Sequence, residues 1–274
     1  MLDVFLNWLD GAPIGLLGLF VLLGMFAAAG AGVSLRDRHK RAGKLQQPDS
    51  QEGYVVSAML GLLALLMGFT FALAVDRFET RRVLVLEDSN AIGTAYLRAQ
   101  LLGEPHRSRL SGLLIAYTDN MVQLAEAQRG KNGELLARDD RLLTDLWSAT
   151  AAAYDSVRGL QLSLALVNAV NTVIDLDASR RAARQAHVPT PVFVALLVYL
   201  MVTAALLGYV LLGWRTRVAG AITLALLTLS FVLVIDIDRP TSGSIRETQG
   251  PMEQLQKSLR SQPPQVFDHW RAQS

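Results

Sequence analysis

The residues from Tyr54 to Leu102 constrain this chain more than any other stretch. They begin as the apolar sequence YVVSAMLGLLALLMGFTFALAV and continue as the charged sequence DRFETRRVLVLEDSNAIGTAYLRAQLL. Between Phe69 and Ile92 there is neither glycine nor proline, so nothing marks a stop where a membrane surface would lie. At 1.5 Å per residue, a helix of this length spans about 70 Å, more than twice the thickness of a bilayer core. The sequence therefore predicts one helix that joins a membrane domain to a helical domain outside the lipid.

Three further segments are apolar and long enough to cross a bilayer, at residues 14–33, 192–214 and 218–235. Together with the apolar half of the long stretch they make four blocks in which the apolar residues concentrate, and the apolar fraction of the chain, 51%, is high for a water-soluble protein. A signal peptide is the alternative for the first segment, but such a peptide begins with positive charge. Residues 1–12 instead carry Asp3 and Asp10 and no Lys or Arg. We therefore expect a retained helix, and four spans in contact with the lipid bilayer.

The short loops between spans set the expected orientation. Residues 36–53 contain five Lys or Arg, and Arg215-Thr216-Arg217 joins the last two spans. Both loops must lie on one side of the membrane, and positive loops stay in the cytoplasm. The sequence thus predicts a multi-pass protein of a bacterial inner membrane, with the domain at 76–188 and both termini in the periplasm.

We expect an all-α membrane protein with a bundle of long extramembrane helices inserted between the second and third of its four spans. The predicted parts are a first helix pair at 1–75, the bundle at 76–188, a second pair at 189–235 and an external tail at 236–274. Within the bundle, helices are predicted to Leu102, from about Pro105 to Gln128 and from about Asp139 to Ala186. A short helix is expected after Pro251.

Small residues recur at every fourth position of the spans, a spacing that lets helix backbones approach closely in lipid. The first span carries Gly24, Ala28 and Gly32, and the third carries Ala204 and Gly208. We interpret this pattern as helix packing, with the lining of a conduction path as the alternative.

One face of the long helix changes from apolar to polar along its length. Its members follow steps of three and four residues: Phe69, Leu73, Asp76, Thr80, Val83, Glu87, Asn90 and Thr94. Around a symmetry axis, these residues would form a hydrophobic constriction below rings of carboxylates, which attract cations. The alternative is that the same face packs against the chain's own third extramembrane helix, with Glu87 paired to an arginine.

Charged residues also gather just outside the predicted span ends. We expect them to form a collar of salt bridges at the membrane surface, with a site for lipid headgroups or an anion as the alternative. The collar comprises Asp76, Arg77, Glu79, Arg81, Arg82, Arg180, Arg181, Arg184, Asp236, Asp238 and Arg239.

Several classes of function lack support in the sequence. There is no cysteine, the four histidines lie far apart, and motifs of hydrolases, zinc proteases, P-loop proteins and dinucleotide-binding proteins are missing. A net charge of +2 without a basic aromatic stretch does not indicate nucleic-acid binding. The spans carry almost no charge, which weighs against a proton-coupled transporter but not against a passive channel. We expect no enzyme, no cofactor and no bound metal.

Three segments carry a resemblance to a known family: LLALLMGFTFALAVDRFETRRVLVLEDSNAIGTAYLRAQLL at 62–102, VNTVIDLDASRRAARQAHVP at 170–189 and VIDIDRPTSGSIRETQGPMEQL at 234–255. In these segments the chain resembles the bacterial membrane family described as bestrophin-like. The resemblance implies four spans with a helical domain between the second and third. It also implies similarity to bestrophins, which are pentameric ion channels with long helices that continue from their spans.

Two functions follow as hypotheses. The first is a homo-oligomeric passive ion channel, a pentamer by analogy, whose pore is lined by the second span and its continuation. The second is a membrane-anchored structural or adaptor protein whose external bundle binds a protein or a lipid.

Overall fold

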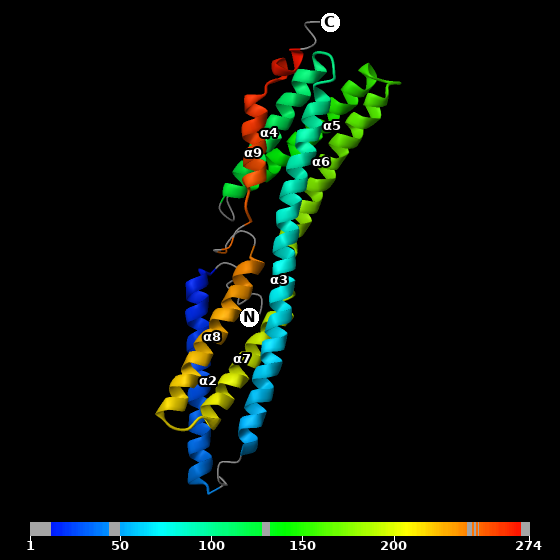
Figure 1. Cartoon of the computed structure of the whole chain (residues 1–274). Helices are drawn as coiled ribbons and strands as arrows, with labels where there is room; N and C mark the ends of the chain where they lie inside the picture. Colours follow the sequence, from blue (N-terminus) through cyan, green and yellow to red (C-terminus); the bar gives the residue numbers. More distant parts are fainter. Residues whose placement is uncertain are drawn as a thin grey trace. The chain divides into compact units, whose positions relative to one another are not determined.

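The computed structural model describes residues 12–43, 50–127, 132–239, 243, 245 and 247–269. Asp3 and Asp10 lie outside the described residues. The described part of the chain is helical and contains no strand (Figure 1). Its helices are α2 (Ile14–Arg41), α3 (Ser50–Ala99), α4 (His106–Glu126), α5 (Gly133–Ser156), α6 (Gln161–Gln185), α7 (Thr190–Val210), α8 (Trp214–Asp238), α9 (Gly250–Ser261) and the 3₁₀ helix η1 (Pro264–Asp268).

Four stretches are long and apolar enough to cross a membrane, as the sequence predicts. They lie in α2, in α3, in the stretch Gln161–Val210 and in α8. The protein is therefore an all-α membrane protein with four spans. The chain divides into two compact units, one formed by Met1–Phe78 with His187–Arg246 and the other by Glu79–Ala186 with Glu247–Ser274. We call them the membrane unit and the bundle unit, and α3 contributes residues to both.

In the membrane unit, α2 and α7 pack with their backbones nearly in contact. A Cβ atom added to Gly32 would lie 2.0 Å from the carbonyl oxygen of Ala205, and one added to Gly208 would lie 2.0 Å from that of Ala29. No side chain fits in such a space. Two of the predicted small residues are therefore required for helix packing, which is the role that small residues have between helices in lipid.

Polar groups close the helix ends in this unit. Arg36, only 8% exposed, donates to the backbone carbonyls of Tyr209 and Val210, at distances of 2.5 and 3.3 Å. These carbonyls lie at the end of α7, where the helix itself supplies no donor. At the other end of α7, the carboxylate of Asp238 accepts from the backbone N–H of Val188 at 3.0 and 3.2 Å.

The bundle unit contains the extramembrane part of α3 together with α4, α5, α6, α9 and η1. Its core includes Ile92, Tyr96, Leu114, Tyr117 and Leu146, and the short helix predicted after Pro251 adds Met252 and Leu259 of α9 to the same core.

The helix predicted from Asp139 to Ala186 is wrong in one respect, because it is broken into α5 and α6. The break spans residues 157–160 and includes Gly159, whose φ is +88°. Only glycine adopts such a backbone angle at little cost, so Gly159 permits the chain to leave the helix there.

Candidate functional site

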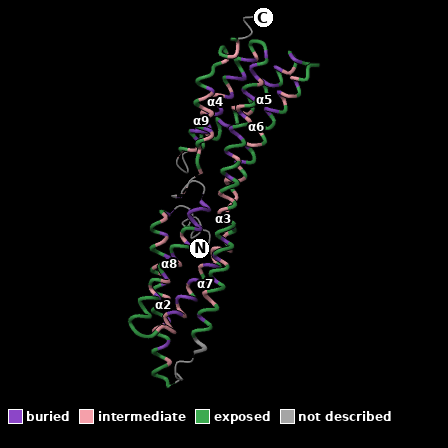
Figure 2. The backbone as a smooth tube through the Cα atoms, viewed as in Figure 1, coloured by how far each residue is buried: buried purple, intermediate pink, exposed green. Residues whose placement is uncertain are grey.

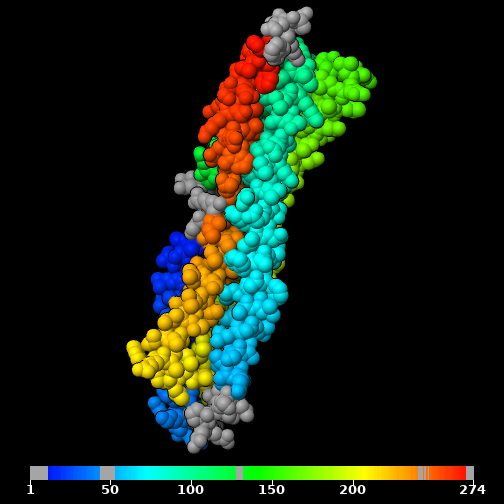
Figure 3. Space-filling model, viewed as in Figure 1, coloured from blue at the N-terminus to red at the C-terminus, as the bar shows by residue number. Residues whose placement is uncertain are grey.

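The face of α3 that the sequence singles out is uncovered in both units. Phe69 is 67% exposed and Leu73 is 38% exposed. The remaining members are exposed as well: Asp76, Thr80, Val83, Glu87, Asn90 and Thr94. Figure 2 shows the exposed positions in green along α3, and in Figure 3 the atoms of α3, in cyan, are uncovered in this view.

The opposite side of α3 packs against the rest of each unit. In the membrane unit α3 buries Leu63, Met67 and Ala74, and in the bundle unit it buries Val85 and Ile92. Because helix positions three or four apart share a face, this periodic burial separates a packed side from a bare side.

In the structure this face does not pack against the third extramembrane helix of the chain, which was the alternative interpretation. Glu87 and Asp76 take part in none of the ion pairs formed by the described residues. The hydroxyl of Thr94 donates to the carbonyl oxygen of Asn90 at 2.9 Å, a bond within the helix that leaves the face open. Two carboxylates and a row of small polar groups are therefore exposed on the described chain.

The predicted collar residues fall into separate sets. Arg180, Arg181 and Arg184 lie in the bundle unit, whereas Asp236, Asp238 and Arg239 belong to the membrane unit and are buried there. Arg239 donates to the carbonyl oxygen of Ala12 at 2.8 Å. Arg77 belongs to the membrane unit, and Arg81 and Arg82 belong to the bundle unit. Arg81 is buried, while Arg82 forms an exposed ion pair with Glu79 at 3.3 Å.

The three arginines of α6 pair with carboxylates from other parts of the bundle unit. Arg180 donates to the carboxylate of Asp88 on α3. Arg181 contacts Asp139 at 2.5 Å, Asp140 at 2.6 Å and Asp177 at 2.7 Å. Arg184 lies 3.4 Å from Glu247. These contacts link α3, α5 and α6 and the segment before α9, so the three arginines of α6 join elements within the bundle unit.

Sequence reasoning missed the acidic half of this network. Asp88, Asp139 and Asp177 are all buried, and the hydroxyl of Tyr117 donates to the carboxylate of Asp177 at 3.3 Å. The amide of Asn120 donates to the carboxylate of Asp139 at 3.2 Å and to the carbonyl oxygen of Leu135 at 3.1 Å. The sequence does show that these acidic residues alternate with core positions on their helices, which hints at burial. That pattern alone does not identify their partners.

Burial changes the acidity of two of these carboxyls. Burial raises the pKa of Asp88 to about 6, against the lowering effect of Arg180. Burial and the nearby charge of Asp177 raise the pKa of Asp139 to about 6, against the lowering effects of Arg181 and Asn120. Desolvation disfavours the ionised form of a carboxyl, and each arginine offsets only part of that cost. Among the described residues no group of three or more His, Cys, Asp or Glu is placed to hold a metal ion.

A model of a known protein family matches most of this sequence. The sequence model of the Bestrophin-like domain matches residues 23–252, which is most of the chain. The chain belongs to the bestrophin-like family.

Solved structures share the fold of this bestrophin-like protein. A crystal structure of a bacterial bestrophin homologue from Klebsiella pneumoniae, solved by Zn-SAD phasing, aligns with a TM-score of 0.67 at 15% identity, covering 89% of this chain and 97% of that one. A mutant of the Klebsiella pneumoniae homologue aligns with a TM-score of 0.68 at 15% identity, again covering 89% and 97%. A crystal structure described as a membrane protein aligns with a TM-score of 0.66, the same identity and the same coverage. No curated protein sequence matches this chain.

Proposed function

We propose that this bestrophin-like protein is the subunit of a homo-oligomeric passive ion channel in a bacterial inner membrane. The observation that carries the proposal is the bare face of α3, which changes from apolar to acidic along one helix and has no partner within the described chain. Family membership supports a channel, since bestrophins are ion channels. Several copies arranged around an axis, five by analogy with bestrophins, would bring these faces together.

Each part of the face has a role in the proposed pore. Phe69 and Leu73 form a hydrophobic constriction, which gates by excluding water. Asp76 and Glu87 form carboxylate rings that concentrate cations and repel anions. Thr80, Asn90 and Thr94 supply hydroxyl and amide groups between and beyond the carboxylates. In this pore the ion selectivity thus depends on Asp76 and Glu87, and closure of the pore depends on Phe69.

The basic loops indicate the orientation that we propose for the channel across the membrane. The positive-inside rule puts the loops at 36–53 and 215–217 in the cytoplasm. The membrane boundary then lies near Val75 and Asp76, with residues 76–188 and both termini in the periplasm. The bundle would form a vestibule at the periplasmic entrance.

The test is ion flux through purified protein in liposomes. We expect the native chain to conduct, and Glu87→Gln and Asp76→Asn to lower the permeability ratio of cations to anions. Asp175→Asn is the matched control, because Asp175 is an exposed acid on α6 that lies off the proposed face. Liposomes that remain silent with both native protein and Phe69→Ala would contradict the channel. They would favour the membrane-anchored adaptor, since a closed constriction should be opened by that change.

A further inference from the structure

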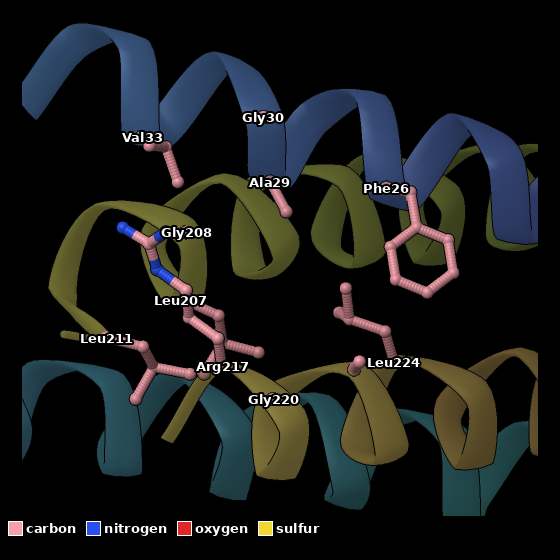
Figure 4. Close-up of a pocket in the computed structure, with 11 residues that line it drawn as sticks. Phe26, Ala29, Gly30, Val33, Leu207, Gly208, Leu211, Arg217, Gly220 and Leu224 are labelled. Carbon is pink, nitrogen blue, oxygen red and sulfur yellow. The ribbon is translucent and has the colours of Figure 1, made fainter. Parts of the chain in front are cut away.

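A cavity of about 220 Å³ lies within the membrane unit, between α2, α7 and α8. Figure 4 shows it with Phe26 at one end and the Arg217 side chain at the other. The walls are formed by apolar side chains, such as that of Leu224, and by the backbone at glycines, such as Gly30 and Gly208. Among the described residues, Arg217 is the one charged side chain that lines it. The cavity is thus apolar along its length and cationic at the end that Arg217 forms, which we call its mouth (Figure 4).

Among the described residues, none neutralises the cationic mouth. Arg217 takes part in none of the ion pairs or side-chain hydrogen bonds found among the described residues, whereas the nearby Arg36 is already bound to the end of α7. Arg217 also lies in the first turn of α8, which has no side-chain cap. The first turn of a helix favours a negative charge nearby, because the helix dipole is positive at that end.

The surroundings restrict which anion can occupy the site. The predicted spans contain no Asp or Glu at all, so the spans of a second copy offer no partner for Arg217. A phospholipid offers a phosphate at the end of an acyl chain, which matches a cationic mouth on an apolar cavity. An acyl chain gains little by leaving other acyl chains, because lipid is as apolar as the cavity wall. The headgroup must therefore supply the preference, and an anionic lipid is favoured near basic residues.

We propose that this cavity is a binding site for an anionic phospholipid, with an acyl chain between α2, α7 and α8 and the phosphate at Arg217. The site does not depend on whether the protein conducts ions. It lies at the end of the membrane unit that carries the basic loops, and so takes lipid from the leaflet on that side.

The test is native mass spectrometry of the full-length protein, titrated in detergent with phosphatidylglycerol or phosphatidylcholine. We expect the native chain to retain phosphatidylglycerol in preference to phosphatidylcholine. Arg217→Gln should weaken phosphatidylglycerol binding about fivefold, the value of one arginine contact with an anionic headgroup. Gly30→Leu should displace the acyl chain, since a Cβ at Gly30 meets nothing within 4 Å and the longer side chain has the cavity to fill.

Two matched controls separate a site from a general surface charge. Arg215→Gln removes an arginine from the same turn of α8 that does not line the cavity, and Gly15→Leu adds a side chain to α2 at a position with no neighbour within 4 Å. Loss confined to Arg217→Gln and Gly30→Leu supports the proposal. Equal losses for both arginine variants, equal binding of the two lipids, or a change of subunit number in Gly30→Leu without lipid loss would overturn it. Should Gly30→Leu fail to fold, the comparison of Arg217→Gln with Arg215→Gln decides the question alone.

Discussion

Asp88 of α3 and Arg180 of α6 form an ion pair in the interior of the bundle unit, with Asp88 0% and Arg180 5% exposed. The two residues are 92 positions apart in the sequence. Burying such a pair is costly, but once it is buried each charge depends on the other. The pair therefore couples the long helix to α6 inside the bundle.

Removal of one partner should be strongly destabilising. We expect Asp88→Ala to lower the free energy of unfolding by about 3–5 kcal/mol, because Arg180 is left as an uncompensated buried charge. Thermal unfolding in detergent measures the effect. Asp175→Ala, at an exposed acid of α6, should change stability by less than about 0.5 kcal/mol. Equal melting temperatures for the two variants would refute a structural role for the pair.

The raised pKa values of Asp88 and Asp139, both about 6, predict a pH dependence of stability. In the unfolded chain an Asp titrates near pH 4. Between about pH 4 and 6 the folded state holds more protons on these groups, so their contribution to stability falls as pH rises and is constant above that window. Asp139→Asn, which does not titrate, should therefore gain stability relative to the native chain as pH rises from 4 to 6. Parallel melting curves of the two proteins against pH would contradict this.

The contact between α2 and α7 predicts a sharp dependence on residue size. Gly208→Ala should destabilise the membrane unit by about 1–3 kcal/mol, because the added Cβ would overlap the carbonyl group of Ala29 and force the helices apart. Gly30→Ala, on the same pair of helices, meets nothing within 4 Å and should have no such effect. Size-exclusion chromatography after graded heating distinguishes the two variants.

In the proposed channel, Phe69 is the residue to remove in order to open the constriction. Phe69→Ala should raise ion flux in liposomes with little change in melting temperature, because the side chain is 67% exposed in the chain. Phe71→Ala is the control, since Phe71 is also exposed but lies on another side of α3. An equal rise in flux for both variants would indicate a general loosening of the membrane unit.

The C-terminal segment contacts the bundle through Arg107 and Tyr96, among other residues. Arg107 lies 2.7 Å from the carboxylate of Asp268 and also donates to the backbone of Pro264, and the hydroxyl of Tyr96 donates to the carbonyl oxygen of Gln262 at 2.8 Å. Arg107→Ala should release this segment and expose it to limited proteolysis. Arg109→Ala, at an exposed position two residues on, should leave the cleavage rate unchanged. The same cleavage rate in both variants would show that other contacts suffice.

Local pattern alone determined much of this protein. Four long apolar blocks required four spans, and the absence of glycine and proline from Phe69 to Ile92 required a helix that does not stop at the membrane surface. The periodicity of α3 identified the graded face from Phe69 to Thr94, but whether that face packs or is exposed was decided by the structure. These features depend on neighbours three or four positions away, which the sequence displays directly.

Partners from distant segments were decided only by the tertiary structure. The arginines of α6 looked like a surface collar, yet Arg180 points to Asp88 and Arg181 to Asp139 and Asp177. The packing of α9 on the bundle core and the break at Gly159 were likewise not visible in the pattern. Which charges meet depends on the rotation and height of each helix against its neighbours. The rotation and the height of a helix are set by the packing of its whole surface against its neighbours, and not by the spacing of residues along the chain.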